Sequence, residues 1–280
     1  MSLVINTNVS ALNAYRNLSN NQSMMSDAIE KLSSGLRINK ASDDAAGLSI
    51  SQGLTSQING LTQGVSNAQD GTNVAQIADG ALGTTQQILQ RMRTLVVQAG
   101  NTGTQDSSSL SAIGSEITSL NSQLNNISGQ TKYGATNLLD GTYNNNFQVG
   151  ANGGDTIALN LSAADVKAVT LGTSTLVIAG SPAAYTTANA TADLAKIDTA
   201  IGTVSSARSG IGATENQLNY TVSNLQTAIT NVTASRSNLT DADLAKEVTA
   251  MTQAQILSQA ATSVLAQANS APQAILKLLP

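Results

Sequence analysis

Among the residues that could bind a metal ion, the acidic residues Asp241 and Asp243 form the most suggestive pair. Two carboxylates two positions apart could supply oxygen ligands to a divalent cation. The same residues precede an apolar helical run, where a carboxylate caps the helix N-terminus and interacts with the helix dipole. We favour capping, and a divalent cation at this pair is the alternative.

Histidine, cysteine and tryptophan are all absent from the 280 residues. Without histidine there is no imidazole to act as a general base, and without cysteine there is no thiolate nucleophile or zinc-binding sulfur. A site built from carboxylates alone stays open in principle, but no grouping of residues supports one. We therefore predict that the chain is not an enzyme and binds no cofactor and no metal.

The charge and hydropathy of the chain argue against two classes of partner. The formal net charge is −4, and no basic stripe with interleaved aromatic residues occurs, so we expect no nucleic acid partner. No run of about eighteen or more apolar residues occurs, so we expect no membrane insertion. The start, MSLVINTNVSALNAYRNL, lacks the basic and apolar regions of a secretory signal peptide, so we expect any secretion to use another route.

Apolar residues recur at alternating spacings of four and three along most of the chain, as in a coiled-coil seam. Aromatic residues make up only 2% of the sequence, so small and aliphatic side chains carry this pattern. The pattern predicts long helices that pack through thin seams. In the N-terminal half the series includes Ile5, Val9, Leu12, Leu18, Met25, Ile29, Leu32 and Leu36, and it resumes at 54–68, 78–96 and 110–127.

The C-terminal half repeats the helical pattern, and a segment of different composition separates the two halves. The helical series runs over residues 194–232 and again over 257–278. Between the halves, residues 133–192 are rich in Gly, Asn, Thr and Val. Residues 147–161 read as two short strands around a glycine turn, and 169–179 read as a further strand.

This order of elements predicts a mostly α-helical protein in which the first helical half packs against the last one. The β region then marks the far end of a hairpin, and both termini meet at the near end. We expect an elongated rod of long antiparallel, coiled-coil-like helices with a small β-hairpin region in mid-chain. Because a rod buries a small share of its surface, its terminal apolar seams need partners, and further copies of the chain are the obvious source.

Two charged residues, Arg208 and Glu215, fall one heptad apart on otherwise apolar seam positions. They could lie at a helix edge with their charges in water, or they could pair with neighbouring helices or subunits and set the register. Gly210 and Gly212 interrupt the same helix, which suggests close helix approach or a local bend.

Several sequence blocks resemble those of bacterial flagellins, in the same order along the chain. They are KLSSGLRIN at 31–39, DDAAGL at 43–48, NAQDG at 67–71, QRMRTLVVQ at 90–98, SSARSGIGATENQL at 205–218 and QILSQAATSVLAQANSAPQAIL from 255. The resemblance covers roughly residues 1–175 and 193–280. Because several independent blocks stand in register, it is specific. The chain resembles a short flagellin with almost no outer variable domain.

The resemblance implies a layered organisation. Residues 1–42 and 238–280 would pair as an inner, terminal coiled-coil layer that lines the export channel. Residues 43–175 and 193–237 would form a rod-like outer layer with the hairpin, and 176–192 would be a short variable segment. The residues implied for the terminal helix seam and for contacts between subunits are Ile5, Val9, Leu12, Leu32, Leu36, Leu257, Val264, Ile275 and Leu278.

The resemblance also implies a structural subunit that self-assembles into the extracellular bacterial flagellar filament for swimming motility, by ordering and burying its terminal helices between subunits. The implied partners are copies of itself, a flagellar export chaperone, the type III export apparatus, the filament cap and the hook–filament junction proteins. A hook–filament junction protein is the alternative, and the close match across the central hairpin argues against it. A secreted helical effector or adhesin would not explain flagellin-like blocks at both ends.

One block also implies a host partner. Arg91, Leu95 and Gln98 lie at helical spacing within QRMRTLVVQ, and the similar block of flagellins belongs to a surface read by the vertebrate Toll-like flagellin receptor. Glu116 resembles another contact in that surface. The block departs from the strongly recognised form, QRVRELAVQ, at its third, fifth and seventh positions. The alternative is a lateral contact between subunits, and both hold if a receptor meets only the free monomer.

Overall fold

The computed structural model describes residues 8–180 and 185–276 and divides the chain into two units. Unit 1 comprises Met1–Ser56 and Asn231–Pro280, and unit 2 comprises Gln57–Thr230. Of the seam residues expected from the sequence, Ile5, Leu278 and the side chain of Ile275 lie outside the described part.

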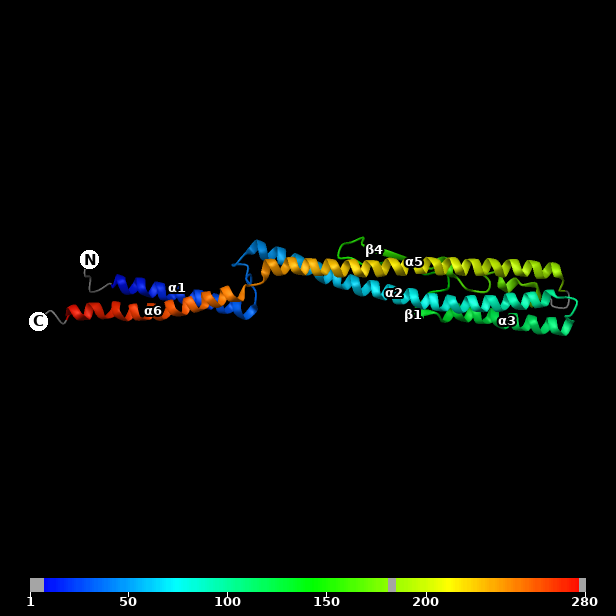
Figure 1. The fold of residues 1–280 in the computed structure, drawn as a ribbon, viewed down its shortest axis with the longest axis horizontal. Coiled ribbons are helices and arrows are strands. Elements are labelled where there is room, and N and C mark those ends of the chain that lie inside the picture. Colours follow the sequence, from blue (N-terminus) through cyan, green and yellow to red (C-terminus); the bar gives the residue numbers. More distant parts are fainter. Residues whose placement is uncertain (1–7, 181–184, 277–280) are drawn as a thin grey trace. The chain divides into compact units, whose positions relative to one another are not determined.

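In unit 1 the first and last helices pair side by side and antiparallel (Figure 1). They are α1 (Val9–Ser34) and α6 (Leu244–Leu276). At one end of the pair, the Asn8 side chain donates a hydrogen bond to the carbonyl of Ala268 at 2.8 Å. At the other end, the Ala242 amide donates to the carbonyl of Gly35 at 2.9 Å. The predicted pairing of the first and last helical segments is therefore confirmed.

The ends of this pair are set by residues suited to capping. Asn8 accepts a hydrogen bond from the amide of Ala11 at 3.0 Å, and Gly35 ends α1 in the left-handed region at φ 70°. The Asp243 carboxylate accepts from the amide of Ala245 at 3.0 Å, so its predicted capping role holds. Asp241 does not join the cap, because its carboxylate accepts from the hydroxyl of Thr240 at 3.1 Å.

Three long helices build unit 2, and they run side by side in Figure 1. They are α2 (Ala45–Gly100), α3 (Ser107–Gln130) and α5 (Thr187–Thr240), of which residues 45–56 and 231–240 belong to unit 1. The apolar series at 54–68 and 78–96 thus lie on one continuous helix. The core between the helices includes the fully buried Leu82, Leu89, Met92, Ile117, Leu124 and Ile197.

Two small hairpins follow α3. Strand β1 (Lys132–Tyr133) pairs with β2 (Thr136–Asn137), and β3 (Asn144–Gln148) pairs with β4 (Thr156–Asn160), both antiparallel. The second hairpin is the one predicted near residues 147–161. It buries one face of β4, where Ile157 and Leu159 are 5% and 1% exposed while the alternate residues face water.

The turn of the second hairpin lies close against α2, at two glycines one helical turn apart. A Cβ atom at Gly64 would lie 2.6 Å from the carbonyl oxygen of Val149, and one at Gly60 would lie 2.8 Å from the Cβ of Ala151. Only hydrogen fits there, so these glycines let the backbone of the turn approach the helix.

Residues 169–179, expected as a strand, instead form turns, the 3-10 helix η2 (Thr173–Thr175) and the start of α4 (Val177–Gly180). A tertiary contact explains the difference. The buried carboxylate of Asp193 on α5 accepts the amides of Val177 at 3.0 Å and Ile178 at 3.2 Å. These bonds satisfy the first turn of a helix, and they outweigh the β-propensity of the Val- and Thr-rich sequence.

Candidate interaction surfaces

The contact between α1 and α6 buries small side chains. The fully buried apolar residues described in unit 1 are Ala14, Ala28, Ile38 and Ala254. The least exposed positions recur at alternating spacings of three and four on both helices, as in a coiled coil. On α1 this row includes Ala11, Ala14, Leu18, Asn21, Met25, Ala28 and Leu32, and on α6 it includes Glu247, Met251, Ala254, Ser258, Ala261, Leu265 and Ala268.

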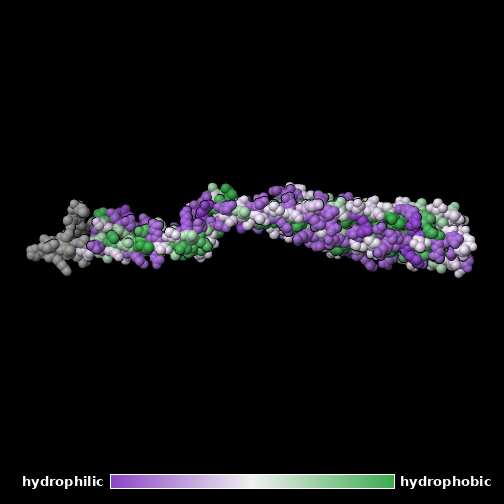
Figure 2. Space-filling view, in the orientation of Figure 1, coloured by the Kyte–Doolittle hydropathy of each residue, from purple (hydrophilic) through white to green (hydrophobic). Residues whose placement is uncertain are grey.

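Many of the large apolar side chains of unit 1 are exposed. Figure 2 shows green, hydrophobic areas on the visible face of α1 and α6. Leu12 is 52% exposed and Val264 is 58% exposed. So many large apolar side chains exposed on one unit are unusual for a monomeric protein. We call this set the outer apolar surface: Val9, Leu12, Tyr15, Met24, Ile29, Ile50, Leu244, Val248, Ile256, Leu257 and Val264.

The structure corrects the register of the seam within the chain. Val9, Leu12, Leu257 and Val264 do not lie between α1 and α6, whereas Leu32 and Leu36 are half-buried. Both helices also carry apolar residues outside the row that forms the pair. The row rich in alanine forms the pair, because helix axes approach more closely over small side chains. Of the outer apolar surface, sequence reasoning missed Tyr15, Met24 and Ile256 as candidate contact residues.

A groove of about 310 Å³ runs along one edge of the α1–α6 pair. Alanines form part of its lining, and the exposed side chains of Met24 and Leu257 stand beside them. Its charged lining residues are Asp27, Lys31 and Glu247. The groove therefore joins the outer apolar surface to a polar border, an arrangement typical of protein contacts.

Hydrogen bonds organise the segment between α1 and α2. The Asp43 carboxylate accepts the backbone amides of Asn39 at 3.0 Å and Lys40 at 2.9 Å, and these bonds lower the pKa of Asp43. The ammonium of Lys40 donates to Glu30, and this bond together with the charge of Glu30 raises the pKa of Lys40. All these groups lie at the surface, so the network shapes the segment and adds little stability.

On unit 2 the structure brings together only part of the predicted receptor patch. Arg91 on α2 and Glu116 on α3 form an exposed ion pair with a distance of 2.8 Å, and Gln98 is exposed. Leu95, in contrast, is 2% exposed and belongs to the core of the helix bundle. Its assignment to the surface patch is therefore wrong, because its side chain faces the other helices of unit 2.

Arg208 and Glu215 both bond to α2 within the chain. The Arg208 guanidinium donates to both carboxylate oxygens of Asp79, at 2.8 and 3.1 Å, and to Gln86 at 2.9 Å. Glu215 accepts a hydrogen bond from Gln76 at 2.8 Å. These contacts favour the register-setting interpretation. No heavy atom lies near a Cβ at Gly210 or Gly212, so close helix approach does not explain these glycines.

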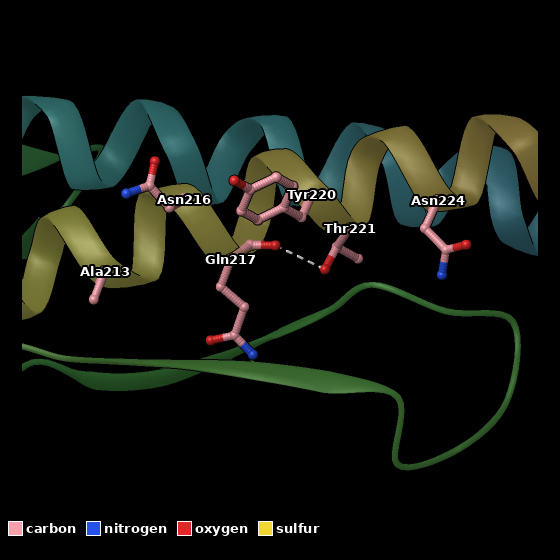
Figure 3. A pocket seen from close by; sticks show the side chains of 6 residues that line it. All are labelled: Ala213, Asn216, Gln217, Tyr220, Thr221 and Asn224. Atoms are coloured by element: carbon pink, nitrogen blue, oxygen red, sulfur yellow. Dashed lines mark hydrogen bonds between the residues drawn. The ribbon is translucent and has the colours of Figure 1, made fainter.

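A second concave surface lies on α5. Six of its residues, Ala213, Asn216, Gln217, Tyr220, Thr221 and Asn224, line it (Figure 3). Tyr220 is 78% exposed, and the Thr221 hydroxyl donates to the carbonyl of Gln217 at 2.8 Å. The lining is uncharged, with one exposed aromatic ring among amides. Such a surface suits a protein contact better than catalysis.

Within residues 8–180 and 185–276, no cluster of three or more acidic residues is placed to hold a metal ion. Across the same residues, no helix combines the length and apolarity that crossing a membrane requires.

Comparison with known proteins decides the family. The family model for the bacterial flagellin N-terminal helical region matches residues 5–144, and that for the C-terminal helical region matches residues 194–279. A flagellin of Bacillus subtilis is 44% identical over 98% of this chain and 99% of its own length. This chain belongs to the bacterial flagellin family.

Further relatives include one of nearly the same length and one that is longer. A flagellin of Halalkalibacterium halodurans is 42% identical over 99% of this chain and all of its own length. The alignment with flagellin B of Vibrio cholerae, at 34% identity, spans 376 positions against 280 residues here, so the Vibrio protein carries additional residues. The crystal structure of Bacillus cereus flagellin is 28% identical over 57% of this chain and 88% of that chain, with a TM-score of 0.49.

The family establishes the role of the protein. This flagellin is a structural subunit of the bacterial flagellar filament, and the filament is an extracellular polymer that drives swimming. The hook–filament junction alternative is not favoured, because the curated relatives that match nearly the whole chain are flagellins.

Proposed function

We propose that this flagellin polymerises by burying its outer apolar surface between neighbouring subunits. One observation carries the proposal: within the α1–α6 pair only alanines are buried among the described apolar residues, while several leucines, isoleucines and valines are exposed. A helix pair that served only its own stability would place the larger side chains inside, since burial of apolar area stabilises in proportion to that area. The inverted arrangement is advantageous when a second contact covers the outside.

The energies involved fit assembly. Full burial of one Leu, Ile or Val side chain contributes about 1.5–3 kcal/mol. Fixing such side chains and the helices that carry them costs conformational entropy of about 1–2 kcal/mol per ordered residue. A single exposed residue cannot offset that cost, but many such residues on every subunit can. This argument favours a mechanism in which ordering and burial of the terminal helices accompany polymerisation.

Leu257→Asp and Val264→Asp test this mechanism, because both side chains lie on α6 and are exposed in the monomer. Each variant should leave the thermal stability of the monomer nearly unchanged. Burying an unpaired carboxylate in an interface costs several kcal/mol, roughly 3–5 if it stays charged, so seeded filament growth should fail. Growth is measured by light scattering and electron microscopy on filament seeds.

Val169→Asp is the matched control. Val169 is 74% exposed but belongs to unit 2, outside the outer apolar surface, so this variant should polymerise normally. If Leu257→Asp and Val264→Asp destabilise the monomer as much as they impair growth, these residues pack inside the folded chain. Normal filaments from both variants would show that α6 contributes no buried contact.

The outer apolar surface also needs a partner that covers it before assembly. We propose that a flagellar export chaperone covers the apolar residues of α6, including Leu257 and Val264, before assembly. The type III export apparatus then delivers the chain to the filament cap, and the first subunits join the hook–filament junction proteins. What supports this sequence is the need to shield an exposed apolar surface from premature contacts.

The layered organisation is part of the same proposal. We place residues 1–42 and 238–280 in the inner layer that lines the channel, residues 43–175 and 193–237 in the outer layer, and 176–192 as the short variable segment. The break between α1 and α2 and the break between α5 and α6 support the inner boundaries. The two structural units divide after Ser56, which follows the first proposed boundary, and after Thr230, which precedes the second.

We also propose that a Toll-like flagellin receptor reads the exposed pair of Arg91 and Glu116 together with Gln98. The ion pair joins α2 to α3 and presents a cation and an anion side by side. Because Leu95 is buried, it takes no part in this contact. The same surface suits lateral packing between subunits, which would hide it in the filament.

A further inference from the structure

Asparagine followed by glycine occurs at two places in the chain, Asn59-Gly60 and Asn152-Gly153. Such a pair is chemically labile, because glycine lacks a side chain that would hinder its amide nitrogen from reaching the asparagine side chain. The reaction requires a glycine amide that is not held in a hydrogen bond, so that its nitrogen can reach Cγ of the asparagine. The two pairs are alike in sequence, so only their structural surroundings can distinguish them.

The two surroundings differ sharply. Asn59 and Gly60 lie inside α2, where the helix holds each backbone amide in a hydrogen bond and fixes the dihedral angles. Asn152 and Gly153 are exposed in the turn between β3 and β4. Among the described residues, the amide of Gly153 donates no hydrogen bond and the side chain of Asn152 makes none.

We propose that Asn152 is a site of spontaneous deamidation in this flagellin, whereas Asn59 is protected by its helix. The amide nitrogen of Gly153 attacks Cγ of Asn152 and forms a C–N bond that closes a five-membered succinimide. The bond from Cγ to Nδ2 breaks, and Nδ2 leaves as ammonia with the proton from the glycine amide. Solvent water then adds to either ring carbonyl and yields aspartate or isoaspartate, without any oxidant or reductant.

The turn converts this small change into a local structural effect. The backbone amide of Asn152 donates to the carboxylate of Asp155 at 3.3 Å, so a new carboxylate at residue 152 arises beside an existing negative charge. Isoaspartate also adds one methylene to the backbone. The adjoining residues Val149 and Ala151 pack against Gly64 and Gly60 with no spare space, so a longer backbone there cannot keep the same contacts.

Deamidated subunits should therefore accumulate with time after the protein is exported. Each deamidation adds one negative charge to a turn that recurs in every subunit of the polymer. This inference goes beyond the assembly mechanism, and it does not depend on that mechanism, because the reaction proceeds in the free full-length chain as well.

The test follows the two pairs side by side in the purified full-length protein. The native protein is incubated in mildly alkaline buffer and digested, and mass spectrometry quantifies aspartate and isoaspartate at residues 59 and 152. We expect Asn152 to convert about tenfold faster than Asn59 or more, a ratio equivalent to about 1.4 kcal/mol in barrier height. In denaturant the two rates should converge, because the helix around Asn59 is then lost.

Gly153→Ala is the matched control, because a Cβ at Gly153 meets nothing within 4 Å and its φ is not positive. The variant should fold normally and should slow conversion of Asn152 about tenfold, equivalent to about 1.4 kcal/mol in barrier height. Equal rates at Asn59 and Asn152 in the native protein would overturn the proposal. So would conversion of Asn152 that Gly153→Ala leaves unchanged.

Discussion

At the scale of single residues, the buried carboxylate of Asp193 organises the segment that precedes α5. Its side chain is fully buried and accepts hydrogen bonds from two amides of α4 and from the Tyr185 hydroxyl at 3.4 Å. Lys196 lies 3.7 Å away on the same helix and contributes a compensating charge. A buried charge with several donors is strongly held, because each removed donor leaves part of the charge unsatisfied.

This environment predicts a loss of stability in alkali. Burial first, and then the negative charge of Asp193, raise the pKa of Tyr185 from its ordinary value of 10.0. Below that value the tyrosine is neutral in the folded and unfolded chains, so its contribution is complete. As the pH rises above 10, the unfolded chain ionises while the folded chain stays protonated, and stability is lost.

Tyr185→Phe should therefore flatten the alkaline decline of the melting temperature. At neutral pH the variant should be less stable by about 1 kcal/mol, because it lacks one hydrogen bond to a buried carboxylate. The measurement is thermal unfolding followed by circular dichroism at about pH 8 and about pH 11, on either side of the tyrosine pKa. An identical decline in both proteins would mean that Tyr185 ionises as freely in the folded state as in the unfolded one.

At the scale of secondary-structure elements, the position of the β-hairpin depends on the surface of one helix. Gly60 and Gly64 leave a flat strip on α2, and the hairpin turn lies against it. The buried side chains of Ile157 and Val149 join Ala68 of α2 and Leu218 of α5 in a small separate cluster. The hairpin is thus attached through close backbone approach and a few apolar contacts.

Gly64→Ala should disturb this attachment. The added methyl group would approach the backbone of Val149, which cannot rotate away, so we expect a destabilisation of about 1–3 kcal/mol. Gly83→Ala is the comparison, because a Cβ there meets nothing within 4 Å, and it should stabilise α2 by up to about 1 kcal/mol. Chemical denaturation of the two variants measures both effects, and equal stabilities would show that the turn adapts without cost.

At the scale of the whole molecule and its polymer, the proposed receptor contact and the proposed lateral contact share the exposed pair of Arg91 and Glu116. An exposed ion pair contributes only about 0–1 kcal/mol to the stability of the monomer. Both charges are accessible to other molecules in the free subunit. A surface that serves lateral packing in the filament is unavailable to a receptor there.

Arg91→Asp should weaken binding of the monomer to a Toll-like flagellin receptor by about tenfold or more, equivalent to about 1.4 kcal/mol. Cross-linked filaments of the unaltered protein should signal far less per subunit than monomers in a receptor reporter assay. Lys132→Asp reverses the charge at another exposed residue of unit 2. This variant should leave unchanged both receptor binding by the monomer and the difference in signal between monomer and filament. Equal signals from monomer and filament would show that the surface stays exposed in the polymer.

The sequence by itself determined the long helices, the hairpin near residues 147–161, the pairing of the first and last helices and the family. These features follow from repeated local signals, such as heptad spacing and the glycine turn, and from blocks that stand in a fixed order. The helix cap at Asp243 was also readable, because capping depends on neighbours in the chain.

Only the tertiary structure decided which apolar row faces inward. Leu12 and Ala14 stand two positions apart on the same helix, and heptad spacing alone cannot rank their two rows, because the choice depends on how closely α6 can approach. The spacing of Leu95 likewise predicts a surface position beside Arg91, but its side chain packs in the core of unit 2. Helix α4 forms before α5 because Asp193, 16 residues after Val177, accepts its first amides.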